Sequence, residues 1–150
     1  MLLAGLLISS LSLASDYQRA WVWETSSPPD IVVCEDAQTT IETVNKAVKF
    51  WRKKGYRLGA VYRSNSICQK DYHPSTIIIH GEQNLDTAAY NAYTTPWFNP
   101  NTGKLVSAVV QFNDSISNVQ ELVNHEIGHG LGLSHTFDHK DVMYGGQRSY

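Results

Sequence analysis

The chain has 150 residues, a length that suits one domain able to bury a sizeable core. Its 12 basic and 14 acidic side chains give a net charge of −2, and this balance argues against a nucleic acid or an anionic membrane as a partner. The short basic cluster Arg52-Lys53-Lys54 is interpreted as a solvated helix end.

The first fourteen residues have the pattern of a secretory leader. An apolar run leads into Ser12-Leu13-Ala14, which has small residues at the two positions that a signal peptidase reads. The run is too short to span a bilayer. No Lys or Arg precedes it, so a buried N-terminal segment is the alternative. We therefore predict a signal peptide over residues 1–14, a single secreted domain over residues 15–150, and no contact with a membrane after cleavage.

The sequence contains two cysteines, Cys34 and Cys68. An oxidising compartment would let them join, and closing a loop of that length stabilises a protein by roughly 3 to 4 kcal/mol in the chain-entropy model. The alternative is two buried free thiols. Neither cysteine has the spacing to a partner that is typical of a metal site, so neither is counted as a ligand.

Patterning in the first half of the chain predicts a β-helix-β order. Residues 31–33 form a short apolar strand, and from residue 39 apolar side chains recur with a period near 3.6. A capping box of Thr39 and Glu42 is expected to begin this helix, and Gly55 is expected to end it.

The next segments complete a sheet. Residues 56–62 have strand character, and residues 76–79 form the continuous apolar run of a central strand, so we expect a parallel core with a right-handed crossover. Residues 88–98 and 104–112 are predicted to form an antiparallel pair joined by turn-forming residues at 99–103.

A second amphipathic helix is predicted near the C-terminal end. Ser117 and Gln120 are interpreted as its capping box. Its apolar face comprises Val119, Leu122, Val123 and Ile127. No internal repeat, low-complexity tract or linker indicates a domain boundary.

This helix carries the sequence HEIGHGLGLSH, residues 125–135. Residues four apart project from the same face of a helix, so His125 and His129 can bind one ion. Gly132 allows the chain to turn, and the turn could bring His135 back as a third ligand. Three neutral imidazoles suit zinc, and the fourth tetrahedral position then remains for water, as in a catalytic site.

Glu126 adjoins the first ligand but points about a quarter-turn away, so we expect it to meet the zinc-bound water. Zinc lowers the pKa of bound water toward about 7, and Glu126 would accept a proton as hydroxide attacks a carbonyl and pass it to the leaving amine. The alternative, unrelated histidines at a helix end, requires a chance match on the order of one in tens of thousands.

The remaining histidines, His73, His80 and His139, are assigned to no zinc ion, because a lone histidine is more often a surface or core residue. A second ion bound by His73, Asp71 or His80 remains an alternative.

HExxHxxGxxH, as it stands at residues 125–135, resembles the signature of the metzincin zinc peptidases. Residues 141–144, DVMY, are similar to the Met-turn of that clan, in which a methionine packs beneath the zinc ligands. The spacing from His135 to Met143, together with Thr136 and Tyr144, resembles the matrixins. Astacin-like peptidases usually have a tyrosine where this chain has Gly145.

The resemblance implies a metzincin fold of the α+β class with an α/β-like core. The expected elements are a mixed five-stranded twisted sheet with an antiparallel edge strand, a long first helix, an active-site helix and a minimal C-terminal subdomain. By this analogy residues 89–93 pair with an extended polypeptide substrate. The likeness covers roughly residues 31–144, but only the last twenty or so are specific.

The sequence departs from the family in three places. Residues 15–29 contain no cysteine of the kind with which a matrixin propeptide caps the zinc, and GGQRSY at residues 145–150 does not match the helix that usually follows. Calcium and a second, structural zinc are common in the family, but here Asn113-Asp114 offers only one acidic residue, so calcium stays possible without support from the sequence.

The preferred interpretation is a secreted zinc endopeptidase. A non-catalytic zinc-containing peptide-binding module is the second interpretation, which the short C-terminal segment favours and the intact Glu126 opposes. A zinc amidase acting on a non-protein peptide is the third. Trp97 and Phe98 are expected either to line a substrate cleft or to serve in packing.

Overall fold

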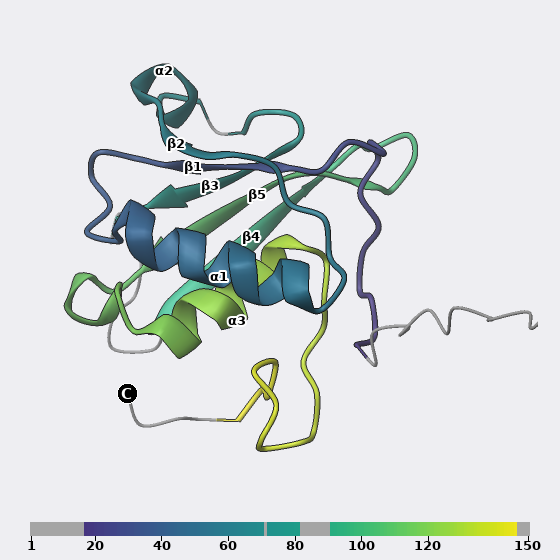
Figure 1. The fold of residues 1–150 in the computed structure, drawn as a ribbon. Coiled ribbons are helices and arrows are strands. Elements are labelled where there is room, and N and C mark those ends of the chain that lie inside the picture. The colour runs from purple at the N-terminus through teal and green to yellow at the C-terminus, as the bar shows by residue number, and fades with distance from the viewer. Residues whose placement is uncertain (1–16, 71, 82–90, 147–150) are drawn as a thin grey trace, which may run out of the picture.

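The computed structural model describes residues 17–70, 72–81 and 91–146, and Figure 1 shows a sheet with two main helices on one face. The predicted signal peptide, Asp71 and residues 89–90 of the expected edge strand lie outside the described residues. The elements are β1 (Asp30–Val33), α1 (Ile41–Lys53), β2 (Val61–Arg63), α2 (Asn65–Cys68), β3 (Thr76–His80), β4 (Ala92–Phe98), β5 (Leu105–Phe112), the 3₁₀ turn η1 (Asp114–Ile116) and α3 (Gln120–Gly130).

The five strands form one mixed sheet in the order β2-β1-β3-β5-β4. The neighbours β2-β1, β1-β3 and β3-β5 are parallel, whereas β4 is antiparallel to β5 and ends the order. The predicted fold class is therefore confirmed, including an antiparallel edge strand and the turn at residues 99–103 that joins it to β5. The edge strand begins at Ala92, so of the segment 89–93 that was expected to pair with substrate only residues 92–93 lie in it.

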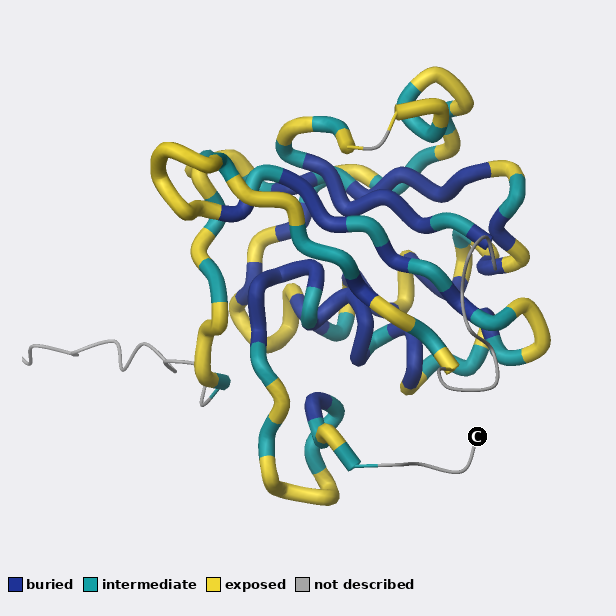
Figure 2. Tube along the Cα trace, turned by 180° about the vertical axis from the view of Figure 1, so that it is seen from behind, coloured by how far each residue is buried: buried dark blue, intermediate teal, exposed yellow. Residues whose placement is uncertain are grey.

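The central position of β3 explains its sequence. Ile77, Ile78 and Ile79 are all fully buried, and because alternate residues of a strand face opposite sides, this strand is covered on both faces. Figure 2 shows buried residues along the inner strands and the helices.

Trp51 of α1 is one of the large side chains in the core between the sheet and the helices. Its side chain is fully buried, and its indole Nε1 donates a hydrogen bond of 2.8 Å to the Asn124 carbonyl of α3. A Cβ atom on Gly128 of α3 would lie 2.7 Å from Cζ2 of Trp51. The absence of a side chain at Gly128 therefore allows α1 and α3 to pack closely.

The predicted cap of the first helix is wrong by one residue. Thr40 is the N-cap, and its Oγ1 accepts a hydrogen bond of 3.1 Å from Thr43 N. Thr39 is fully buried, and Glu42 forms an exposed ion pair with Lys46. Gly55, with a φ of +89°, follows the end of the helix as predicted.

The predicted capping box of the second helix is also wrong. Ser117 donates to the Asp114 carbonyl and thereby closes η1, while the helix begins at Gln120 without a side-chain cap. Gln120 donates to the Thr43 carbonyl instead. The side chains of Ser117 and Gln120, which the motif assigns to a helix cap, instead bond to the 3₁₀ turn and to α1.

The strand predicted at residues 56–62 is shorter and later than expected. Only Val61–Arg63 pair with β1, while Tyr56 and Leu58 are buried in extended chain outside the ladder. The Arg52 guanidinium donates a hydrogen bond of 2.7 Å to the Leu58 carbonyl. This backbone acceptor is therefore satisfied by a side chain and not by a neighbouring strand. The short helix α2 was not predicted.

Cys34 and Cys68 form a disulfide that joins the end of β1 to α2. Pairing is therefore confirmed over the alternative of free thiols. No helix among the described residues has the length and apolar character needed to cross a bilayer.

Candidate metal centre

Helix α3 and the turn after it bring three histidines together. His125 and His129 lie one turn apart, the helix ends at Gly130, and Gly132 adopts a φ of +90°. A Cβ atom at Gly132 would also collide with the Trp21 backbone, so both conformation and space favour glycine there. The chain turns as predicted, and His135 lies beside the other two.

The three Nε2 atoms converge. His129 Nε2 lies 3.1 Å from His125 Nε2 and 3.0 Å from His135 Nε2. The donor atoms of all three side chains lie within 4.8 Å of one another. His125 is 9% exposed whereas His135 is at the surface, so the cluster is reached from one side.

Backbone carbonyls fix the orientation of two rings. His125 Nδ1 lies 2.7 Å from the Val142 carbonyl, and His129 Nδ1 lies 2.8 Å from the Leu133 carbonyl. A carbonyl can only accept, so both Nδ1 atoms donate, and each neutral ring carries its lone pair on Nε2.

Both rings are held in the neutral form. Burial lowers the pKa of His125, and burial together with the neighbouring His125 lowers the pKa of His129 to about 4. At neutral pH the two Nε2 lone pairs face each other at 3.1 Å. Such an arrangement is repulsive unless a cation lies between the rings.

The donor set fits zinc. Imidazole nitrogens sharing a tetrahedral zinc ion lie roughly 3.3 Å apart, given zinc–nitrogen distances of about 2.0 to 2.1 Å. Second hydrogen bonds from metal-bound histidines to carbonyls are typical of such sites. His125, His129 and His135 are therefore the residues that would hold the ion.

Glu126 is directed toward the edge strand. Its carboxylate accepts a hydrogen bond of 2.5 Å from Thr94 Oγ1 of β4, and the residue is 5% exposed. Burial raises the pKa of Glu126 to about 7, although the hydrogen bond from Thr94 opposes this shift. The group of possible metal ligands comprises His125, His129 and His135 but not Glu126. Glu126 therefore lies beside the proposed ligands and is not one of them.

Met143 lies directly beneath α3, the helix that carries His125 and His129. It is fully buried, and a Cβ atom on Gly128 would meet its Sδ and Cε atoms. Its carbonyl accepts a hydrogen bond of 2.8 Å from Thr136 N, which ties the turn to the residue after His135. The turn thus supports the ligands from below and from the side.

Gly145 fits against the third histidine. A Cβ atom there would lie 2.7 Å from both Cγ and Nδ1 of His135 and 2.9 Å from its Cβ. The backbone of Gly145 therefore limits where the His135 ring can go.

An N-terminal arm, residues 17–24, binds the segment that carries His135. Ser134 donates to the Gln18 carbonyl through both N and Oγ, at 3.1 and 3.0 Å. Tyr17 donates to the Asp141 carboxylate at 2.8 Å. Both ends of the described chain thus contribute to the position of the third histidine.

Other predicted residues lie elsewhere. His73 contacts the Pro74 carbonyl, and His139 is exposed. The alternative is a second ion bound by His73, Asp71 or His80. Asp71 lies outside the described residues, and no candidate metal group of the described side chains contains His73, whereas His80 belongs to a group with Cys34 and Asp36. The oxygen of Asn113 accepts from the Ser115 backbone and hydroxyl, a capping role that gives calcium no support.

Trp97 and Phe98 are the last two residues of β4. Trp97 stacks on Tyr72, and both aromatic residues line a cavity of about 490 Å³. By strand alternation Trp97 faces the side of the sheet opposite to Thr94, so it does not face Glu126.

Thr94 and Gly145 are the site residues that sequence reasoning missed. Nothing in the sequence near Thr94 indicates its partner, because the contact with Glu126 joins residues 32 positions apart. In the sequence, Gly145 only distinguishes this chain from astacin-like peptidases. Its position two residues after Met143 is the one signal that could have indicated its contact with His135.

Comparison with known proteins gives two findings. The matrixin family model matches residues 22–148. The chain is also similar to a protein of Heliothis virescens ascovirus 3e named "Putative matrix metalloproteinase", with 26% identity over 129 residues. That match covers 75% of this chain but 27% of the viral protein, so the chain spans about a quarter of the relative's length. With the family model matching most of its length, this chain belongs to the matrixin family of peptidases.

Proposed function

We propose that this protein is a secreted, zinc-dependent endopeptidase that cleaves extended polypeptides. The observation that carries the proposal is the convergence of three Nε2 atoms beside a buried glutamate that is held by the edge strand. Membership of a peptidase family supports a hydrolytic role for this arrangement.

The proposed mechanism assigns one role to the ion and the others to the chain. Zinc bound by His125, His129 and His135 would act as a Lewis acid and make water a better nucleophile near neutral pH. Glu126 accepts the proton from the attacking water and delivers it to the leaving nitrogen. A pKa of about 7 suits a group that must first accept and then donate a proton.

The edge strand supplies the place for substrate. β4 ends the strand order, and an extended peptide can add to such an edge through main-chain hydrogen bonds. Thr94 lies on β4 and holds the Glu126 carboxylate, so a peptide aligned along this strand passes the proposed base. This geometry supports polypeptide as the substrate.

Secretion rests on two independent features. The apolar leader ends in small residues of the kind that a signal peptidase recognises for cleavage. The Cys34–Cys68 disulfide is typical of proteins that fold in an oxidising compartment.

The decisive experiment measures casein cleavage and bound zinc for wild type and Glu126→Gln. We expect one zinc ion in each protein, and cleavage only by wild type. If both bind zinc and neither cleaves casein or a quenched peptide library, the peptidase proposal fails. If Glu126→Gln cleaves as fast as wild type, the assigned base is wrong.

A further inference from the structure

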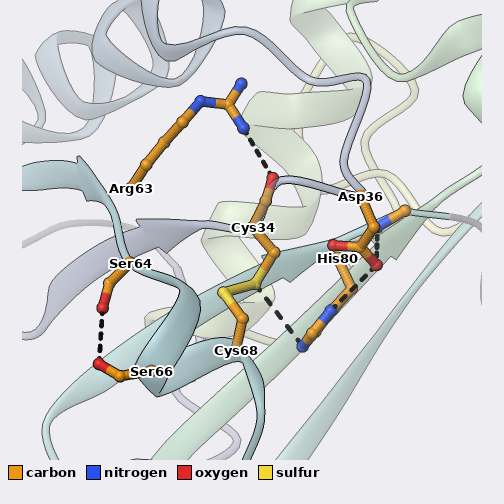
Figure 3. Close-up of a disulfide and its surroundings, with 8 residues drawn as sticks. Cys34, Asp36, Arg63, Ser64, Ser66, Cys68 and His80 are labelled. Atoms are coloured by element: carbon orange, nitrogen blue, oxygen red, sulfur yellow. Dashed lines mark hydrogen bonds and ion pairs between the residues drawn. A yellow bond between two sulfur atoms is a disulfide. The ribbon is translucent and has the colours of Figure 1, made fainter.

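A second cluster of metal-ligand side chains surrounds the disulfide (Figure 3). Cys34 directly follows β1, His80 ends β3, and Asp36 lies in the loop after β1. Because β1 and β3 are parallel, their carboxyl ends meet at the same edge of the sheet. Cys68 reaches this edge from α2.

The histidine in this cluster is oriented toward sulfur. His80 Nδ1 lies 3.2 Å from Asp36 Oδ2, and His80 Nε2 lies 3.7 Å from Cys34 Sγ. The same carboxylate oxygen accepts a hydrogen bond from Gly81 N at 3.3 Å, which fixes its position. Nδ1 donates to the carboxylate, so the lone pair of a neutral His80 is on Nε2 and faces the sulfur.

A carboxylate bound to the far nitrogen of a histidine is a common support for metal-binding histidines. Cys34 is 1% exposed, and the side chain of His80 is 17% exposed, so water has little access to this face of the sulfur. The arrangement therefore has a partly buried nitrogen donor aimed at a sulfur atom, with its orienting group already in place.

The separations suit a tetrahedral metal ion. Sulfur and nitrogen atoms on one zinc ion lie roughly 3.6 Å apart, and two thiolate sulfurs lie roughly 3.8 Å apart, given typical bond lengths. The observed sulfur–nitrogen distance is 3.7 Å. The Cα atoms of the two cysteines are 5.7 Å apart, and rotation of the cysteine side chains can bring their thiolates to that spacing.

We propose that reduction of the Cys34–Cys68 disulfide creates a second zinc site, in which the two thiolates and His80 Nε2 are the ligands and Asp36 orients His80. Two molecules of a small thiol supply the two electrons: the protein S–S bond breaks, a small-molecule disulfide forms, and two cysteine thiols result. Zinc then replaces the two thiol protons, which pass to solvent. The disulfide and the metal ion exclude each other because they use the same sulfur atoms.

Sequence spacing concealed this site, since Cys34 and Cys68 are 34 positions apart and His80 is on another strand. Thiolate ligands favour zinc over calcium or magnesium, and three protein ligands leave one position for solvent. The proposal does not depend on peptidase activity.

Cobalt(II) distinguishes this site from the histidine cluster, because only thiolate ligands give a sulfur-to-cobalt charge-transfer band. We would titrate the protein with cobalt(II) and zinc before and after reduction with a phosphine, which is removed before metal is added. Reduced wild type is expected to show the band, to bind one more metal ion than the oxidised form, and to protect both thiols from alkylation.

Variants locate the ligands. His80→Ala should weaken the additional binding at least tenfold, and Asp36→Asn should weaken it roughly 10- to 100-fold, as is typical of orienting partners. His139→Ala, which removes an exposed histidine outside the cluster, should bind like wild type. The double variant Cys34→Ser/Cys68→Ser should show no band in either redox state.

Three results would overturn the proposal. The first is equal metal content of oxidised and reduced wild type, and the second is an unchanged band and affinity in His80→Ala. The third is loss of near-ultraviolet circular dichroism on reduction that added zinc does not restore.

Discussion

Thr94 connects the edge strand to the proposed base. Its hydroxyl is the described donor to Glu126 Oε2, and the carboxylate is otherwise in a desolvated environment that raises its pKa. A buried carboxylate without its donor would favour the protonated form and lose its fixed position.

Thr94→Val is therefore expected to lower kcat/KM for a quenched peptide by roughly 10- to 100-fold, the equivalent of one hydrogen bond to a charged group. Zinc content should not change, because the described hydrogen bonds of the Thr94 hydroxyl go to Glu126 and not to a histidine. Thr94→Ser keeps the hydroxyl and should retain most of the activity. Full activity in Thr94→Val would show that this hydrogen bond does not position Glu126.

Gly145→Ala tests the contact with His135. Its φ is outside the left-handed range, so alanine causes no backbone strain, but the new Cβ atom would lie 2.7 Å from the ring. We expect zinc affinity to fall roughly tenfold or more in a chelator competition titration, by analogy with other supporting residues. Lys140→Ala, an exposed change nearby, is the control, and equal affinities in the two variants would contradict the prediction.

Helices α1 and α3 meet at a position where propensity and packing predict opposite outcomes. Replacing a mid-helix glycine by alanine stabilises an isolated helix by about 1 kcal/mol. At Gly128 the new methyl group would instead collide with Met143 and lie 2.7 Å from Trp51 Cζ2.

We expect Gly128→Ala to lower the free energy of unfolding by roughly 1 to 3 kcal/mol, because over-packing costs more than propensity returns. Urea denaturation with a chelator present measures this without a contribution from zinc. Asn45→Ala on the exposed face of α1 should change stability little. A stabilised Gly128→Ala variant would mean that the helices separate at little cost.

At the level of elements, the sequence pattern predicted those helices, strands and turns that depend on residues close together in the chain. The fully buried β3, the amphipathic α1 and the turn at Gly132 follow from apolar runs, a 3.6 period and glycine conformation. The caps were not predictable, because Asn118 accepts from the Thr40 backbone at the start of α1, and this contact spans 78 positions. The three histidines could be grouped because they are close in sequence, whereas Thr94 and the Cys34–His80 cluster are brought together only by the sheet.

For the whole molecule, the disulfide closes a loop across 34 positions and attaches α2 to the sheet. Cys34→Ser/Cys68→Ser should therefore lower the free energy of unfolding by roughly 3 to 4 kcal/mol, mainly because the unfolded chain without the cross-link has more conformational entropy. Urea denaturation without reductant and with chelator gives the value. Adding reductant should produce a similar loss in wild type and none in the variant, and a loss below roughly 1 kcal/mol would contradict the loop estimate.

The N-terminal arm has a consequence for the order of folding. Tyr17 reaches Asp141 across 124 positions, and the backbone of Ala20 and Trp21 donates to the Gly132 carbonyl in the turn before His135. Contacts between residues so far apart in sequence form slowly, because the entropy of closing a long loop is lost before the contact contributes any favourable free energy. His125 and His129 can therefore be arranged early by a single helix, whereas His135 reaches its final place only after the N-terminal arm has bound the segment around Gly132 and Asp141. In the proposed peptidase, binding of the ion by all three ligands is then one of the last events during synthesis, and a partly made chain lacks the complete centre that the proposed cleavage requires.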